Sequence, residues 1–352
     1  MRLNSLTSLR FFAALGVFIH HFEFFAATKS EILKKLSVIF FEGFVGVTFF
    51  YVLSGFIISY SYEQHRKKGT YRIRDFFYNR FSRLYPVHIA TLILAIFAYI
   101  PISYFNTIDI TKLIANALLI QSAIANSDFF FSFNGVSWSV STEMFFYISF
   151  VFLVTLNTKQ LLVIGGCVLS MIIFHIVGVN HSPQYSGWLF YINPAFRVID
   201  FIVGMLLCRL FMSGGLSLNG KNTTTYEIAS ILLMVVFIVV GMKYVPMIWR
   251  YDIYYIIPMA MIVYVFAFGN GAISKLMNNR VIILLGEASF SLYMIHQIWI
   301  NVAFRLFPVN IDSAYHVLSF MLPVVIAGCL ISCVMFIFYE RPINNFLRSI
   351  RK

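Results

Sequence analysis

Long apolar runs separated by short polar gaps are the dominant pattern along this 352-residue chain. A helix needs about 20 apolar residues to cross the hydrocarbon core of a membrane, and ten runs fit that need. They are 6–27, 38–60, 84–101, 138–156, 160–179, 191–212, 226–242, 252–268, 285–304 and 316–339. Because the runs are continuous rather than alternating, they favour helices over the strands of a membrane β-barrel. We therefore predict an all-α polytopic membrane protein with about ten transmembrane helices.

Two segments depart from this simple pattern. The segment 111–125, inside the long loop 102–137, is too short and too polar to cross a membrane, and it predicts one interfacial or re-entrant helix. The first run contains Arg10, His21 and Glu23. A cleaved signal peptide has an apolar core that is free of charge, so we expect this helix to stay in the mature protein.

The composition changes the picture by excluding whole classes of protein. Hydrophobic residues make up 60% of the chain and charged residues only 11%, whereas soluble domains carry about 25% charged residues. An ordinary cytosolic enzyme and a secreted disulfide scaffold are therefore excluded. No linker, repeat or soluble segment stands out, which predicts a single domain over 1–352. No metal site is predicted, because no Cys pair is accompanied by further ligands.

The net charge of +12 is a topology signal in this chain. Lys and Arg fall mostly in the gaps between apolar runs. With ten spans, 17 of them lie on the side of both termini and 7 on the other side, while Arg10 and Arg197 lie within runs. Cytoplasmic loops are the ones enriched in Lys and Arg, so both termini are predicted to be cytoplasmic. The basic charge therefore gives no reason to expect a nucleic-acid partner.

Ionisable residues at membrane depth are costly and suggest function, and the first run holds two on one helix face. Arg10 and His21 are eleven residues apart, which brings them within about 20° of the same direction and about 16 Å apart along the axis. One elongated substrate could touch both. The alternatives are a snorkelling anchor for Arg10 and a buried, hydrogen-bonded histidine for His21. His20 points elsewhere and is expected to pack against a neighbouring helix or make a local hydrogen bond.

A second candidate site is the pair Arg80 and Arg83, in the stretch 71–86. Three residues apart, the two side chains share a helix face. Guanidinium groups placed in this way suit phosphate or pyrophosphate, which they bind through forked hydrogen bonds. The alternative is an ordinary positive-inside loop that binds anionic lipid.

Three further motifs carry polar groups at the ends of apolar runs. Trp138 and Ser139 lie at the outer mouth of a span, and Glu143 follows about one turn later. Glu143 could pair with His21, as the carboxylate that fixes the imidazole tautomer. The alternatives are a structural salt bridge with Arg197 or a hydrogen bond to a facing helix.

The segment 286–297 places Ser289, Tyr293 and His296 on one face of a helix. At 339–342, Pro342 is expected to stop the last helix, and Glu340–Arg341 is as consistent with a local ion pair as with a site.

Taken in order, these motifs resemble the acyltransferase-3 family of bacterial integral-membrane acyltransferases. The resemblance rests on six segments: LRFFAALGVFIHH (9–21), FVGVTFFYVLSGFII (44–58), RFSRLYP (80–86), SWSVSTEMFFY (137–147), GEASFSLYMIH (286–296) and YERP (339–342). They span nearly the whole chain. One departure is Thr48, where the family often has Asp, so that any charged role is absent there.

The resemblance implies an enzyme of the bacterial cytoplasmic (inner) membrane that moves an acyl group, commonly acetyl, from cytoplasmic acetyl-CoA or another acyl-CoA to a hydroxyl of a cell-envelope glycan or glycolipid. It also implies that His21 is the catalytic residue and that Arg80 and Arg83 bind the donor. Many relatives carry a further C-terminal domain, and for this chain we expect transfer to be completed within the membrane domain.

The predicted mechanism combines these residues. Arg80 and Arg83 hold the donor phosphates, Arg10 steadies the donor near the membrane entrance, and His21 acts as general base or as acyl carrier. Weaker assignments to substrate or oxyanion binding go to Trp138, Ser139, Ser289, Tyr293 and His296.

The expected partners are membrane lipid, the donor and the acceptor. The sequence determines neither the identity of the acceptor nor whether the protein forms a homo-oligomer. The alternative from another class is a secondary transporter or glycolipid flippase that uses the same charges as a proton relay.

Overall fold

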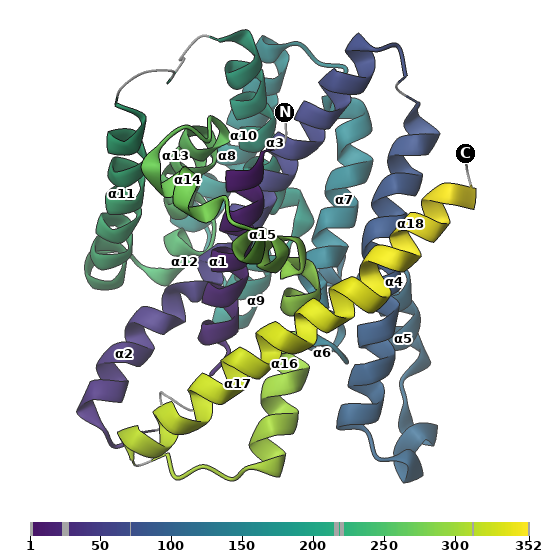
Figure 1. Cartoon of the computed structure of the whole chain (residues 1–352), viewed down its shortest axis with the longest axis vertical. Helices are drawn as coiled ribbons and strands as arrows, with labels where there is room; N and C mark the ends of the chain where they lie inside the picture. Colours follow the sequence, from purple (N-terminus) through teal and green to yellow (C-terminus); the bar gives the residue numbers. More distant parts are fainter. Residues whose placement is uncertain are drawn as a thin grey trace.

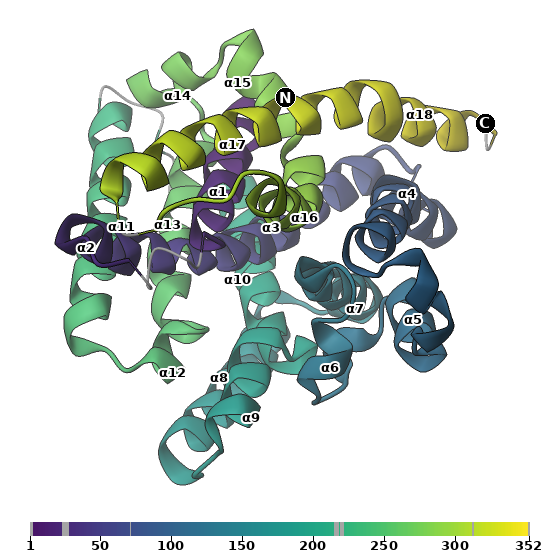
Figure 2. The ribbon, with the colours of Figure 1, turned by 90° about the horizontal axis from the view of Figure 1, so that it is seen from below.

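The protein is all-helical in the computed structural model, which describes residues 3–22, 28–70, 72–214, 218, 222–311 and 313–350. The long helices pack into one bundle, with α1 near its centre (Figures 1 and 2). The longer elements are α1 (Asn4–His20), α2 (Glu31–Phe41), α3 (Gly46–Lys67), α4 (Ile73–Tyr99), α7 (Trp138–Leu153), α8 (Thr158–Gly178), α10 (Pro194–Ser213), α11 (Thr223–Tyr244), α13 (Ile253–Ala267), α16 (Ser289–Leu306), α17 (Ala314–Met335) and α18 (Arg341–Ile350).

Shorter helices connect these elements. They are η2 (Glu42–Val45), η3 (Ile102–Thr107), α5 (Ile110–Ala117), η4 (Gln121–Ala123), α6 (Ser127–Phe130), η5 (Gly135–Ser137), α9 (Pro183–Gly187), η6 (Trp188–Ile192), α12 (Met247–Arg250), α14 (Ala272–Met277), α15 (Arg280–Glu287) and η7 (Phe336–Glu340). A short helix was predicted in the loop 102–137, and α5 lies there, capped by the Asp109 side chain. Its place at a membrane interface stays a prediction.

The polytopic membrane character is confirmed, with fewer clear spans than the ten predicted. Among the described residues, seven helical stretches are long and apolar enough to cross a membrane, or eight if one bent pair counts as a single span. The predicted runs 6–27 and 191–212 correspond to α1 and α10. The described part of α1 is only 17 residues long, and residues 23–27, with Glu23, lie outside the described residues. The charged residues of α10, notably Arg197 and Asp200, interrupt its apolar character.

The run 285–304, predicted as one span, is bent in the structure. α15 and α16 meet at an angle of 65° around Ala288. Gly286 of α15 packs so tightly on α1 that an added Cβ would lie 2.1 Å from the Thr7 carbonyl oxygen. α15 therefore follows the surface of α1, whereas α16 turns into the bundle. The bend sets the position of Ser289, the first residue of α16.

Pro342 does not stop the last helix, contrary to expectation. α17, η7 and α18 form one continuous stretch, Ala314–Ile350, which crosses Figure 1 as a long diagonal ribbon. The segment before Pro342 is the π-helical turn η7. Proline disrupts a helix because it lacks an N–H to donate to the preceding turn. A π-helical turn already departs from the regular bonding pattern there, so the proline can be accommodated.

The closest helix pair, α3 and α10, packs through glycines. A Cβ on Gly204 would lie 2.0 Å from the Val52 carbonyl oxygen, and one on Gly55 would lie 2.1 Å from the Phe201 carbonyl oxygen. Small residues of this kind allow membrane helices to approach backbone to backbone. This contact fixes α3, which supplies one wall of the cavity described below.

Gly204→Ala should therefore destabilise the protein, by about 1–3 kcal/mol for an overpacked contact. Gly166→Ala is the matched control, because a Cβ there has nothing within 4 Å, and alanine favours a helix over glycine. Thermal unfolding in detergent, followed by loss of the monodisperse peak in size-exclusion chromatography, compares them. Equal melting temperatures for the two variants would contradict the packing argument.

Candidate active site

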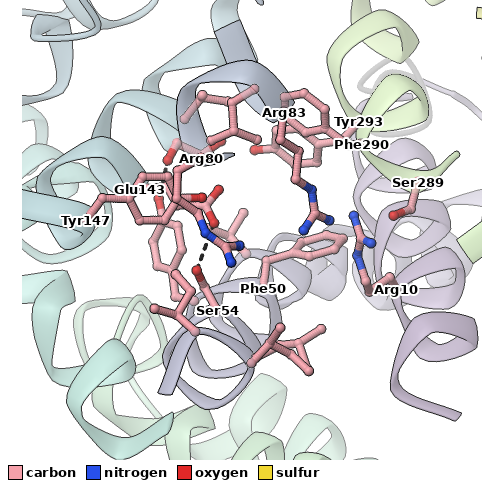
Figure 3. A pocket seen from close by; sticks show the side chains of 18 of the residues that line it. Arg10, Phe50, Ser54, Arg80, Arg83, Glu143, Tyr147, Ser289, Phe290 and Tyr293 are labelled. Carbon is pink, nitrogen blue, oxygen red and sulfur yellow. Dashed lines mark hydrogen bonds between the residues drawn. The ribbon is translucent and has the colours of Figure 1, made fainter. Parts of the chain in front are cut away.

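A polar cavity of about 210 Å³ lies between α1, α3, α4, α7 and α16 (Figure 3). Each of these helices contributes at least one polar side chain to its wall. The polar lining residues are Thr7, Arg10, Tyr51, Ser54, Arg80, Arg83, Ser139, Glu143, Tyr147, Ser289 and Tyr293. Seven of the residues singled out in the sequence as candidate catalytic or donor-binding groups, or as substrate or oxyanion ligands, thus come together from four separate motifs: Arg10, Arg80, Arg83, Ser139, Glu143, Ser289 and Tyr293.

Three guanidinium groups give the cavity its electrostatic character. Arg10 of α1 and Arg83 of α4 point toward one another across it, and Arg80 reaches in one turn earlier on α4 (Figure 3). Arg80 Nε is buried without a hydrogen-bond partner among the described residues. Like charges held together with incomplete hydrogen bonding favour the binding of an anion between them.

The carboxylates near the cavity only partly balance this charge. Glu143 lines the cavity and accepts a hydrogen bond of 2.8 Å from Ser54 Oγ. Glu340 is buried nearby, accepts a hydrogen bond of 2.5 Å from Ser291 Oγ, and interacts electrostatically with Arg10 and Arg83. Two carboxylates against three guanidinium groups leave a net positive charge at the site.

The predicted pairing of Glu143 with His21 was wrong. Glu143 instead bonds to Ser54 and interacts with Tyr147, one turn along α7. Of the two alternatives, the salt bridge from Glu143 to Arg197 was wrong, because Arg197 pairs with Asp200 at 2.7 Å. The other, a hydrogen bond to a facing helix, is confirmed by the bond from Ser54 of α3. Glu143 lies at the level of Arg10 in the bundle, about three helical turns from His21 along α1.

α16 brings two hydroxyl groups to the cavity. Ser289 is fully buried, and its Oγ has no hydrogen-bond partner within the part of the chain that the structure describes. Tyr293, one turn further along, packs edge-to-face on Phe50 with ring centroids 5.9 Å apart and lines the cavity together with Ser139. Both are therefore placed to donate a hydrogen bond into the cavity. Trp138 lies outside its lining and packs on Tyr191.

His21 and His296 form a pair next to the cavity rather than in its lining. His296 Nε2 lies 3.2 Å from His21 Nδ1, and the ring centroids are 4.8 Å apart. Sequence reasoning singled out both histidines but not their contact, since no periodicity links α1 to α16. His20 makes a hydrogen bond of 2.7 Å with the carbonyl oxygen of Phe41, at the end of α2, and packs on the Phe41 ring, which confirms that it packs against a neighbouring helix.

A second pocket adjoins the first where α3 ends and α4 begins. It is about 310 Å³ in size and shares Arg80 and Ile58 with the first cavity. Arg72 and Arg348 also line it, together with the aromatic residues Tyr62, Phe76 and Tyr78. Sequence reasoning missed this pocket, because Arg348 is distant in sequence and reaches the site only through the continuous helix α17–α18.

The chain is similar to known acyltransferases over most of its length. The sequence profile of a family described as an acyltransferase domain matches residues 3–340. Acyltransferase MdmB of Streptomyces mycarofaciens is 27% identical over 333 residues, covering 87% of this chain and 81% of that protein. Peptidoglycan O-acetyltransferase OatA of Listeria monocytogenes is 25% identical over 325 residues, covering 83% of this chain and 48% of that protein.

A Staphylococcus aureus protein, named only provisionally as an O-acetyltransferase, is 27% identical over 321 residues, covering 83% of this chain and 49% of that protein. The chain thus spans most of the Streptomyces protein and about half the length of the other two. No solved structure matches the chain.

Proposed function

The chain belongs to the acyltransferase-3 family of membrane acyltransferases, and on this premise we propose that it is an O-acyltransferase of the cell envelope. The donor is acyl-CoA, with acetyl-CoA as the first candidate, and the acceptor is a hydroxyl of a glycan or glycolipid. The observation that supports this most directly is the convergence of Arg10, Arg80 and Arg83 on one buried cavity. A polyanionic donor suits such a cluster, whereas a neutral sugar alone does not.

The donor binds with its phosphates at the arginines. Coenzyme A carries a pyrophosphate and a ribose phosphate, and forked guanidinium groups bind phosphate oxygens in pairs. The pyrophosphate lies at Arg80 and Arg83, and the nucleotide end occupies the adjoining pocket with Arg72 and Arg348. Glu143 helps to hold Arg80 in place, since the two side chains attract each other across the cavity.

The acyl thioester reaches His21 past the hydroxyl groups of α16. Tyr293 packs against Phe50 on one side and against His296 on the other, with the His296 centroid 5.7 Å away. Ser289 and Tyr293 donate hydrogen bonds to the thioester oxygen as charge develops on it. His21 takes the proton of the acceptor hydroxyl, the acceptor oxygen bonds to the acyl carbon, the C–S bond breaks, and the proton passes to the CoA sulfur. In a variant of this route, His21 carries the acyl group as an acyl-histidine intermediate before the acceptor receives it.

The topology follows from the same proposal. α1 and α10 cross the membrane with the eight clearer spans, giving ten crossings, a single domain over 1–352, and both termini in the cytoplasm of a bacterial cell. Of the cations behind this orientation, Arg2, Lys221, Arg351 and Lys352 lie outside the described residues. The donor then enters where α3 ends and α4 begins, and the acceptor approaches His21 from the opposite face.

The full-length protein in lipid nanodiscs tests the proposed function. Mild alkali removes ester-linked acyl groups, so alkali-treated envelope glycan from the source organism supplies acceptor hydroxyls. With acetyl-labelled acetyl-CoA, we expect glycan-dependent release of free CoA thiol and alkali-labile label on the glycan. Absence of thiol release, together with gradient-driven flux in proteoliposomes, would instead establish a transporter.

Arg80→Gln and Arg83→Gln should each raise the KM for acetyl-CoA about 10- to 100-fold, with a smaller change in kcat. Each removes a charge-assisted hydrogen bond to the donor, which is worth roughly 1.5–3 kcal/mol. Arg209→Gln is the matched control, because Arg209 bonds to the Leu156 carbonyl oxygen and to Thr158, away from both pockets. An unchanged KM in both Arg80 and Arg83 variants would rule out donor binding by this pair.

A further inference from the structure

We propose that His296 is a positioning residue that, together with the Val17 carbonyl oxygen, fixes the tautomer and the orientation of His21. This inference rests on the proposed function, in which His21 is the base or the acyl carrier. It gives His296 a different task from the substrate or oxyanion binding predicted from its motif, and it replaces the carboxylate that sequence reasoning had sought in Glu143.

The first step is the protonation of His296 itself. Its side chain is fully buried on α16, and Nδ1 lies 2.6 Å from the Tyr293 carbonyl oxygen and 3.3 Å from that of Leu292. A carbonyl oxygen only accepts hydrogen bonds, so Nδ1 carries the proton. In the neutral imidazole, Nε2 is then an acceptor. The rings of Phe18 and Tyr293, with centroids 5.5 and 5.7 Å away, hold the imidazole in this orientation.

The second step is the protonation of His21. Its Nδ1 lies 2.8 Å from the Val17 carbonyl oxygen and 3.2 Å from His296 Nε2. Both neighbours are acceptors, so Nδ1 of His21 carries a proton that the two share. A proton on His296 Nε2 instead would place an unprotonated His21 Nδ1 against the Val17 carbonyl oxygen, two acceptors in contact. The neutral His21 ring is therefore basic at Nε2.

The third step connects this tautomer to acyl transfer. When His21 Nε2 takes a proton from the acceptor or bonds to the acyl group, the ring becomes positively charged. The hydrogen bond from Nδ1 to His296 then strengthens, because charge-assisted hydrogen bonds are about twice as strong as neutral ones. A carboxylate serves this purpose in the triads of soluble hydrolases. At membrane depth a neutral imidazole serves it without burying another charge.

His296→Asn and His296→Gln separate positioning from packing. Both side chains are polar and fit the site, but only Gln is long enough to place an acceptor oxygen where Nε2 lies. In the nanodisc assay with acetyl-CoA and alkali-treated glycan, we expect H296N to lower kcat about 10- to 100-fold, the range found when a metal-binding histidine loses its outer-shell partner. H296Q should recover most of that loss, and the KM for acetyl-CoA should stay unchanged in both.

His88→Asn is the control for losing a buried imidazole, because His88 is fully buried and bonds to the Asn116 carbonyl oxygen through Nε2. Its kcat should stay within about twofold of the wild type. An inactive wild-type protein would show that the proposed function has failed. An active wild type with equal kcat for H296N, H296Q and H88N would overturn the role of His296 alone, as would a rise in KM without a fall in kcat.

Discussion

Replacement of His21 by alanine should lower acyl transfer by roughly 10²- to 10⁴-fold, the contribution expected of a general base. The donor-binding arginines lie about three helical turns away along the bundle, so the KM for acetyl-CoA should be nearly unchanged. The fall in kcat without a change in donor binding would distinguish a group that acts on the acceptor from one that holds the donor. Both kinetic constants are measured with acetyl-CoA and alkali-treated glycan in nanodiscs.

His20→Ala is the matched control for this variant. The two histidines are neighbours with ring centroids 5.0 Å apart, but His20 bonds to the Phe41 carbonyl oxygen and packs against Phe41 and Phe44. We expect H20A to retain activity within a few-fold of the wild type. Full glycan acetylation by H21A at normal expression would remove His21 from the chemistry, and equal losses in the two variants would indicate a packing effect.

A helix could be predicted from sequence wherever contact with lipid alone determines its position. The predicted runs 160–179 and 226–242 agree with α8 and α11 to within a few residues, because a lipid-facing helix needs only a continuous apolar stretch. The bend between α15 and α16 could not be predicted. It depends on the close contact of Gly286 with the backbone of α1, which is a tertiary contact without a local signal.

In the candidate site, too, local features could be predicted from the sequence and contacts between helices could not. Spacing along one helix correctly paired Arg80 with Arg83 on one side of the cavity, because the period of a helix fixes which side chains share a face. It could not give the relative depth of two helices in the membrane. Glu143 was therefore paired with His21, although it lies at the level of Arg10. The contact between His21 and His296 was missed for the same reason.

Arg197 lies at the centre of a buried ionic network that sequence reasoning did not anticipate. Its guanidinium group is 2.7 Å from Asp200 and 3.6 Å from Asp252, and all three side chains are fully buried. It also donates hydrogen bonds to Thr48 Oγ1 at 2.9 Å and to the Tyr251 carbonyl oxygen at 2.5 Å. Thr48 thus accepts from Arg197, at the position where the family resemblance led us to expect Asp. Two carboxylates already outnumber this cation, so a third would add to the excess of carboxylates.

Arg197→Leu should destabilise the protein by about 3–5 kcal/mol, because it leaves two buried carboxylates without their cation. In thermal unfolding in detergent this corresponds to a fall in melting temperature on the order of 10 °C. Arg209 lies on the same helix, but it bonds only to Thr158 and to the Leu156 carbonyl oxygen, near the exposed end of that helix. Arg209→Leu should therefore change the melting temperature far less. Combining Arg197→Leu with Asp200→Asn and Asp252→Asn should restore much of the stability, since the cost lies in the unpaired charges. If the melting temperature of the triple variant is no higher than that of Arg197→Leu, the loss of stability comes from packing and not from charge.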